Sequence, residues 1–140
     1  MNKFKRGSAA VLAGLMLWMV SGTSFGMGLG RPVSRAILGD TLTVSVPVRL
    51  EPGEDLSPEC IKADVYFGDD KLPSAAIQTQ LKTSPAPVGR TPEAVIQIRT
   101  TTLINEPVVT VYVVAGCQTR LTRKLVTLVD PPDLNEPVVS

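Results

Sequence analysis

The chain has 140 residues, with 14 Lys and Arg against 13 Asp and Glu, a formal net charge of +1 and no His. The absence of His excludes His-assisted nucleophiles, His-ligated metals and the usual proton switch near neutral pH. Two Cys alone cannot complete a four-ligand structural zinc site. The near-zero charge provides no basic field for nucleic acid or anionic lipid.

Residues 1–26 have the organisation of a secretory signal peptide. The first cations are Lys3, Lys5 and Arg6. An unbroken apolar run, Ala9–Val20, follows, and then a small and polar exit, Ser21–Gly26. This order is typical of an export signal, and small residues at the −3 and −1 positions predict cleavage after Gly26. The apolar run is shorter than the roughly 20 residues that span a bilayer, although an uncleaved anchor remains the alternative. We therefore expect a periplasmic protein.

Cleavage would change the charge of the chain. Three of the 14 cations lie in the signal, so 11 remain against 13 carboxylates, and the mature net charge is 11 − 13 = −2. About 114 residues remain, enough for one domain with a modest core. We predict one β-domain over residues 27–130 and a Pro-rich tail or linker over 131–140.

Cys60 and Cys117 are the only cysteines. An even pair in an exported chain predicts a disulfide. The competing interpretations are two buried free thiols that behave as small apolar residues, or a cysteine that pairs with another protein.

The rest of the pattern predicts strands and, outside the export signal, no helix. Seven segments are predicted as strands: 33–37, 41–50, 61–67, 76–81, 94–100, 108–115 and 120–129. Strict alternation over 41–50 indicates a half-buried strand, and Pro47 within it predicts a sheet edge or a bulge. The continuous apolar run 108–115 predicts a central strand that is buried on both faces. Seven short strands with turns between them predict an all-β fold, an immunoglobulin-like antiparallel β-sandwich.

The cysteine positions agree with this topology. In such a sandwich the third and sixth strands are antiparallel neighbours. Cys60 begins the predicted third strand and Cys117 follows the predicted sixth, so the two cysteines are expected to lie side by side.

Both ends of the predicted domain resemble a known family. The opening segment contains Gly28-Leu29-Gly30 and then Ala36-Ile37-Leu38-Gly39-Asp40 before a long alternating strand. The closing segment runs from Glu106-Pro107 to Leu128-Val129-Asp130-Pro131-Pro132. These motifs are similar to those of the periplasmic N-terminal domain of FimV-like proteins, whereas the middle of the chain is too divergent to compare.

The resemblance implies a module of the type IV pilus and cell-pole machinery that is associated with secretin assembly. FimV-like proteins usually carry a peptidoglycan-binding LysM module, a membrane span and an acidic cytoplasmic region, none of which is present in these 140 residues. Gly116-Cys117 also stands where the family commonly has a Trp-Pro type of turn. Only the role of a periplasmic assembly module is implied, and peptidoglycan could be a partner only indirectly.

We therefore expect a non-enzymatic scaffolding module that binds envelope proteins, without a cofactor or metal. No Ser-x-x-Lys or phosphate-binding Gly loop occurs in the sequence, and Gly-x-Ser-x-Gly occurs only within the predicted signal peptide, at Gly22–Gly26. The predicted partner-binding features are the strand with Pro47, the loop 85–92 and the basic hairpin of Arg120, Arg123 and Lys124. Carbohydrate binding is the alternative function, with Tyr66 and Tyr112 as the available aromatic platforms.

Overall fold

The computed structural model describes residues 27–84, 88–89 and 93–132. The predicted signal peptide, most of the loop 85–92 and most of the tail 131–140 lie outside the described residues. Within the described ranges, no helix has the length and apolar character needed to cross a bilayer.

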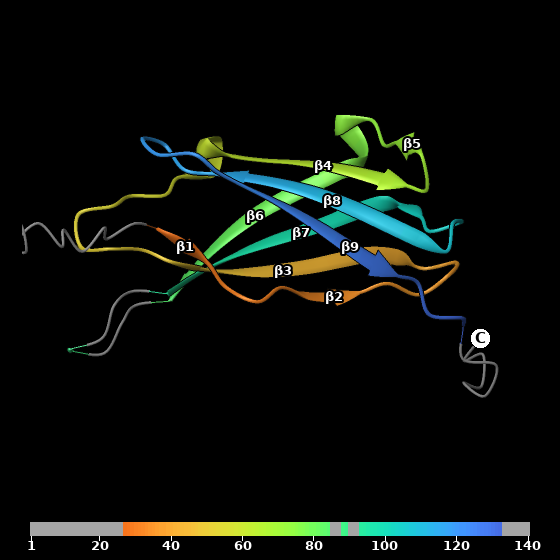
Figure 1. The fold of residues 1–140 in the computed structure, drawn as a ribbon, viewed down its shortest axis with the longest axis horizontal. Coiled ribbons are helices and arrows are strands. Elements are labelled where there is room, and N and C mark those ends of the chain that lie inside the picture. Colours follow the sequence, from red (N-terminus) through yellow and green to blue (C-terminus); the bar gives the residue numbers. More distant parts are fainter. Residues whose placement is uncertain (1–26, 85–87, 90–92, 133–140) are drawn as a thin grey trace, which may run out of the picture.

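The described chain forms two antiparallel sheets that pack face to face (Figure 1). The first sheet has the order β1-β3-β7-β6, and β2 also pairs with β3. Its strands are β1 (Gly28–Leu29), β2 (Val33–Arg35), β3 (Thr41–Arg49), β6 (Ile77–Ser84) and β7 (Glu93–Leu103). The second sheet has the order β5-β4-β8-β9. Its strands are β4 (Ile61–Phe67), β5 (Asp70–Lys71), β8 (Val108–Ala115) and β9 (Leu121–Leu128). Two short 3-10 turns, η1 (Pro58–Cys60) and η2 (Ser74–Ala76), precede β4 and β6.

The predicted fold class is confirmed: the protein is an all-β, immunoglobulin-like antiparallel sandwich. The strand order corresponds to the A-B-E-D and C-F-G sheets of that fold. The described residues form nine strands where the sequence predicted about seven; the two additional strands, β1 and β5, have only two residues each. Strands this short carry no readable alternation. The weakly predicted segment 76–81 is also longer than expected, since β6 continues to Ser84.

Branched aliphatic side chains fill the space between the sheets. In β3, Leu42, Val44, Val46 and Val48 are buried while the residues between them are half-buried. The other fully buried aliphatic side chains include Ile96, Ile98, Ile104, Val65, Val109, Val111 and Val113. Because strand side chains point alternately to the two faces, this layer fixes which residues face the solvent.

The prediction that the strand with Pro47 is an edge is wrong. β3 lies between β7 and the β1–β2 segment, and Pro47 pairs with Val95 of β7 without a register shift at that point. The irregularity lies in the opposite neighbour. Leu29 pairs with Val48 and Val33 pairs with Ser45, so residues 30–32 stand opposite only two residues, 46 and 47. The extra residue interrupts the partner strand where Pro47 lacks an N–H donor, and an inner proline is therefore tolerated.

The prediction that β8 is buried on both faces is also wrong. β8 is central, but only its inward residues are buried, and its outward residues are half-buried. The reason is that no third layer covers the outer face of this sheet in the described part of the chain. Valine on the outer face of an antiparallel sheet made the strand resemble a fully buried one.

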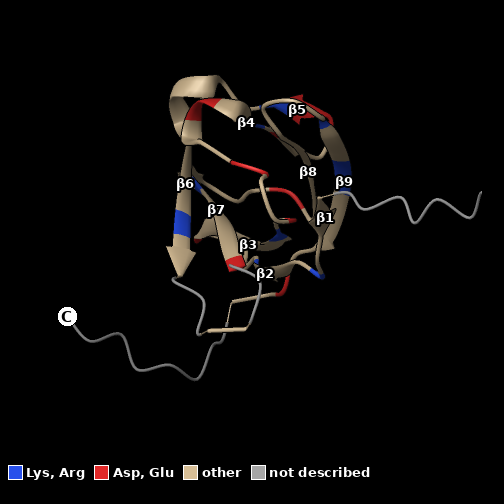
Figure 2. Ribbon diagram, turned by 90° about the vertical axis from the view of Figure 1, so that its left-hand side faces the viewer, with Lys and Arg blue, Asp and Glu red and all other residues tan. Residues whose placement is uncertain are grey.

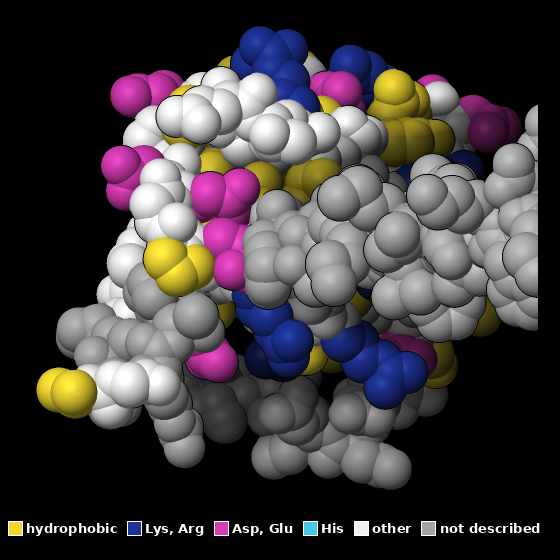
Figure 3. All heavy atoms as spheres, turned by 60° about the vertical axis from the view of Figure 1, so that its left-hand side comes forward, with side chains coloured by type: hydrophobic (Ala, Val, Ile, Leu, Met, Phe, Trp, Pro, Cys, Tyr) yellow, Lys and Arg dark blue, Asp and Glu magenta, His cyan; other side chains and the backbone are white. Residues whose placement is uncertain are grey.

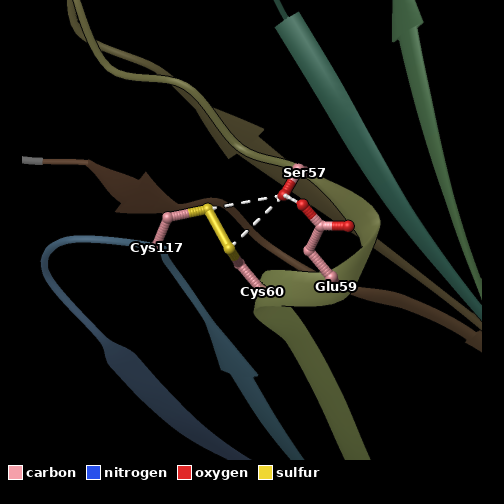
Figure 4. The surroundings of a disulfide bond; sticks show 4 residues. All are labelled: Ser57, Glu59, Cys60 and Cys117. Carbon is pink, nitrogen blue, oxygen red and sulfur yellow. Dashed lines mark hydrogen bonds between the residues drawn. A yellow bond between two sulfur atoms is a disulfide. The ribbon is translucent and has the colours of Figure 1, made fainter.

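The disulfide prediction is confirmed. Cys60 and Cys117 are bonded, with their Cα atoms 5.0 Å apart, and β4 and β8 are antiparallel neighbours as the cysteine positions required. Figure 4 shows the bond at the corner where β4 begins and β8 ends, with Ser57 Oγ 3.4 Å from the Cys60 sulfur and 3.0 Å from Glu59 Oε1. The bond joins the β8–β9 hairpin to the start of β4.

The described chain before β3, residues 27–40, closes one side of the sandwich; we call it the N-terminal segment. Asp130, which follows β9, forms a short parallel ladder with the chain after β2: the Asp130 N–H donates to the Ala36 carbonyl and the Leu38 N–H donates to the Asp130 carbonyl. The Thr127 hydroxyl also donates to the Ser34 hydroxyl at 3.1 Å. These contacts attach the segment beside the end of β9.

Removal of the disulfide is expected to destabilise the domain strongly. The bond closes a loop with a sequence separation of 57 residues, which the chain-entropy model values at about 4 kcal/mol. The double variant Cys60→Ala/Cys117→Ala should lose roughly this amount of unfolding free energy in urea titration. A loss below about 1 kcal/mol would show that the bond contributes little to the constraint on the unfolded chain.

Candidate functional site

The outer face of the second sheet carries the most distinctive solvent-facing side chains of the described domain. We define the tyrosine face as the outward residues of β4, β5, β8 and β9 around the two tyrosines. These residues are Lys62, Asp64, Tyr66, Lys71, Val108, Thr110, Tyr112, Val114, Thr122, Lys124, Val126 and Leu128. The register places them in cross-strand rows, so side chains far apart in sequence are direct neighbours.

The two tyrosines form the centre of this face. Their ring centroids are 5.7 Å apart, with an interplanar angle of 76°, an edge-to-face arrangement. Lys71 Nζ lies 5.9 Å from the Tyr66 centroid, and Lys124 Nζ lies 5.6 Å from the Tyr112 centroid. Both distances allow cation–π attraction. The tyrosines are half-buried, so the lysines and the ring contacts leave little flat aromatic surface free.

Asp64 pairs with Lys71 at 3.0 Å on the same face. The hydrogen bond and then the charge of Asp64, followed by Tyr66, raise the pKa of Lys71 above its ordinary value of 10.5. Lys71 therefore stays charged at neutral pH. Three lysines and one aspartate give the tyrosine face a positive balance, opposite in sign to the predicted mature chain.

Apolar side chains extend the face toward the end of β9. Val126 is 59% exposed and Leu128 is 76% exposed. Leu128 pairs directly with the half-buried Val108 of β8. The sequence analysis did not single out this apolar group. The signal was the alternation of β9: Lys124, Val126 and Leu128 share one face of the strand, and a face that is exposed to solvent normally carries polar residues at all such positions.

The structure separates the residues of the predicted basic hairpin. Arg120 is exposed in the β8–β9 loop, beside a depression of about 190 Å³ next to the disulfide. Lys124 is exposed on the tyrosine face. Arg123 points to the other side of β9, where Nη1 donates to the Leu29 and Gly30 carbonyls at 2.7 and 2.8 Å. Arg123 thus joins the second sheet to the interrupted partner of β3.

Some elements of the fold carry charged residues of one sign only. Strands β6 and β9 carry basic residues, as Figure 2 shows. The loop between β3 and β4 is acidic, with Glu51, Glu54, Asp55 and Glu59. Figure 3 views the end of the molecule that contains this loop and shows acidic side chains spread over it, several of them beside Lys and Arg side chains. The predicted Pro47 feature is a half-buried position inside the first sheet, and the predicted loop 85–92 is described only at residues 88 and 89.

Among the described residues, no group of three or more His, Cys, Asp or Glu side chains is placed to hold a metal ion.

Comparison with known proteins adds little beyond this geometry. The sequence matches no protein-family profile and no curated protein. Among solved structures, the chain is similar to the full ectodomain (Ig1–Ig3) of mouse nectin-like molecule 4, with 12% sequence identity and a TM-score of 0.38. The similarity covers 76% of this chain and 32% of that ectodomain, so the chain spans about a third of the protein it matches.

Adjacent residues of β9 provide a matched test of their different placement. Arg123→Ala removes two charge-assisted hydrogen bonds to backbone carbonyls and should lower the unfolding free energy by about 1.5–3 kcal/mol. Lys124→Ala removes an exposed cation and its cation–π contact with Tyr112, and should change it by less than about 1 kcal/mol. Urea unfolding of both variants measures the difference. Equal effects would contradict the assignment of opposite faces.

The pair on the tyrosine face predicts a titration shift. Asp64→Asn removes the charge that raises the pKa of Lys71, so this pKa should fall toward 10.5, as followed by NMR of the lysine side chain. Because the folded pKa is raised, the contribution of the pair is present below the ordinary lysine pKa and is lost as pH rises through the folded value. The side-chain NMR signals of Lys62, on the same face, serve as the internal control, and an unchanged pKa of Lys71 would show that the contact does not persist in solution.

Proposed function

We propose that the chain is a non-enzymatic interaction and scaffolding module of the periplasm, FimV-like in character, that serves type IV pilus or secretin assembly. The observation that carries the proposal is the tyrosine face. It combines exposed aliphatic groups, two tyrosines and three lysines on one rigid sheet. Aromatic residues and apolar centres with a charged rim are characteristic of surfaces that bind proteins.

The charges of the face specify the chemistry of the partner. Its lysines outnumber its only carboxylate, and that carboxylate is already paired with Lys71. A partner that presents carboxylates around an apolar group would complement both features. Complementary charge increases the association rate and sets partner choice more than it adds affinity. The partner we propose is therefore an envelope protein with an acidic and apolar docking surface.

The export signal and the FimV-like motifs support the cellular setting. The disulfide is consistent with an oxidising compartment. Glu59 of the acidic loop lines the same depression as Lys62 and Val114, so a carboxylate borders the tyrosine face at this end, while its lysines still outnumber Asp64. The link to pilus or secretin assembly rests on the resemblance of the two ends of the domain.

Peptidoglycan or another carbohydrate is the second candidate, and the tyrosine pair is the observation that favours it. Sugar rings stack on open aromatic faces. In this structure each tyrosine ring already has a lysine ammonium within 6 Å, and the two rings contact each other edge to face. The geometry therefore favours a protein partner over a sugar ligand.

Site-directed photo-crosslinking tests the proposal. A photoreactive amino acid at Val126 should form an adduct with one envelope protein in living cells, identifiable by mass spectrometry. Reversing two charges of the face, Lys71→Glu and Lys124→Glu, should reduce the adduct because the partner is acidic. Arg99→Glu, an exposed charge reversal on the first sheet, is the matched control and should leave the adduct unchanged.

Two outcomes would overturn this assignment. One is an adduct of equal strength in the charge-reversed variant. The other is co-sedimentation of the purified chain with peptidoglycan sacculi that is lost in Tyr112→Ala, which would establish the carbohydrate alternative. The charge-reversed variant should retain its melting temperature, because none of its altered side chains is buried.

A further inference from the structure

Strand β6 is a long and regular edge of the first sheet. All eight of its residues pair with β7 without a register shift, and none of its residues is fully buried. Figure 2 shows β6 at the left-hand margin of the domain, beside β7. Natural edges are usually blunted by proline, bulges or several charges. β6 contains no proline and one charged residue, Lys82.

The direction of the β6 backbone groups follows from alternation along neighbouring strands. The Gly30 N–H donates to the Pro47 carbonyl, so the polar groups of Pro47 point away from β7. Because this direction alternates along a strand, the backbone N–H and C=O groups of Val46 point toward β7. Those of its partner Ile96 point back toward β3. The next residue of β7, Gln97, therefore points toward β6.

Gln80 pairs with Gln97 and so directs its polar groups toward β7. The residues of β6 on either side of each such position must therefore direct their backbone N–H and C=O groups away from β7, toward the open edge. Ile77 agrees with this assignment, because its N–H donates to a carbonyl of the preceding 3-10 turn instead of to β7. The residues whose N–H and C=O groups are left open on β6 are Thr79, Leu81 and Thr83.

Other edges in the described part of the chain are shorter or contact the N-terminal segment. Arg123, Thr127 and Asp130 attach the N-terminal segment along β9. The β1–β2 segment is interrupted and has two-residue and three-residue strands. β5 and the hydrogen bond from the Leu72 N–H to the Val65 carbonyl cover the end of β4. β6 is thus a long open edge of the described domain.

We propose that β6 pairs with the β6 strand of a second copy of this chain, antiparallel and two-fold symmetric, with Leu81 on the axis. In this register Thr79 faces Thr83 of the second copy, and Thr83 faces Thr79. The three open residues of each copy meet the three open residues of the other, so each open N–H finds a carbonyl. This pairing goes beyond the proposed function and does not depend on it.

The side chains of β6 are compatible with this register. Leu81, which packs against the edge of the core and remains half-exposed, meets its own copy. Lys82 lies opposite Gln80, so no like charges face each other directly. A register shifted by one residue would place inward side chains opposite outward ones. A two-fold pairing uses the same edge on both copies, and therefore closes as a dimer instead of growing into a fibre.

Charge-swapped variants of the full-length chain test the pairing. Leu81→Lys places two cations across the axis and Leu81→Glu places two anions there, so each variant alone should lose the dimer of the wild type in sedimentation velocity. An equimolar mixture should recover a heterodimer, because opposite charges then face each other. Recovery shows that both variants are folded. Leu128→Lys and Leu128→Glu, the same changes on the tyrosine face, are the matched controls and should remain dimeric.

Several results would overturn the proposal. A wild-type chain that is monomeric at all accessible concentrations would do so. So would dimers that persist in Leu81→Lys alone, or a mixture that stays monomeric while each variant keeps a cooperative melting transition. Loss of the dimer in the Leu128 variants but not in the Leu81 variants would place the interface on the tyrosine face.

Discussion

The buried aliphatic layer between the two sheets is the constraint from which the other features follow. With one Phe and no other aromatic residue among its buried side chains, the core is built largely from Val, Ile and Leu. These residues must point inward at every second position, which forces their neighbours outward. The tyrosine face is the set of residues that this requirement exposes on the second sheet. Packing of the core therefore does not dictate which residue types occupy the tyrosine face.

The N-terminal segment decides which sheet edges remain available. It pairs with β3 and also contacts the chain at the end of β9. The irregularity at residues 30–32, opposite Pro47, lets an inner strand contain a proline. The guanidinium of Arg123 satisfies carbonyls at that irregularity. The same contacts attach the N-terminal segment beside β9, whereas β6 remains a long open edge of the described domain. A residue that resembles a binding cation in the sequence is thus part of the fold.

The sequence could predict the features that depend on alternation and strand neighbours. The 41–50 pattern, the sandwich and the disulfide all follow from period-two order and the position of two cysteines. The placement of Arg123 could not be predicted, because each face of β9 carries both polar and apolar residues. Apolar Val126 and Leu128 share the outward face with Lys124, so the pattern does not show which face is buried. The interior position of β3 could not be predicted either, since it depends on an interruption in another segment, to which Pro47 gives no local signal.

The two proposed surfaces are compatible with each other. The open backbone groups of β6 lie in the plane of the first sheet, whereas the tyrosine face is directed outward from the second sheet, so pairing through β6 leaves the tyrosine face of each copy free. A two-fold pair would present two identical faces on one rigid frame. For a partner that is itself repeated, the second contact becomes intramolecular, and the avidity can exceed either single affinity without any new contact. A small domain with weak individual contacts could in this way act as a scaffold for a repetitive envelope assembly.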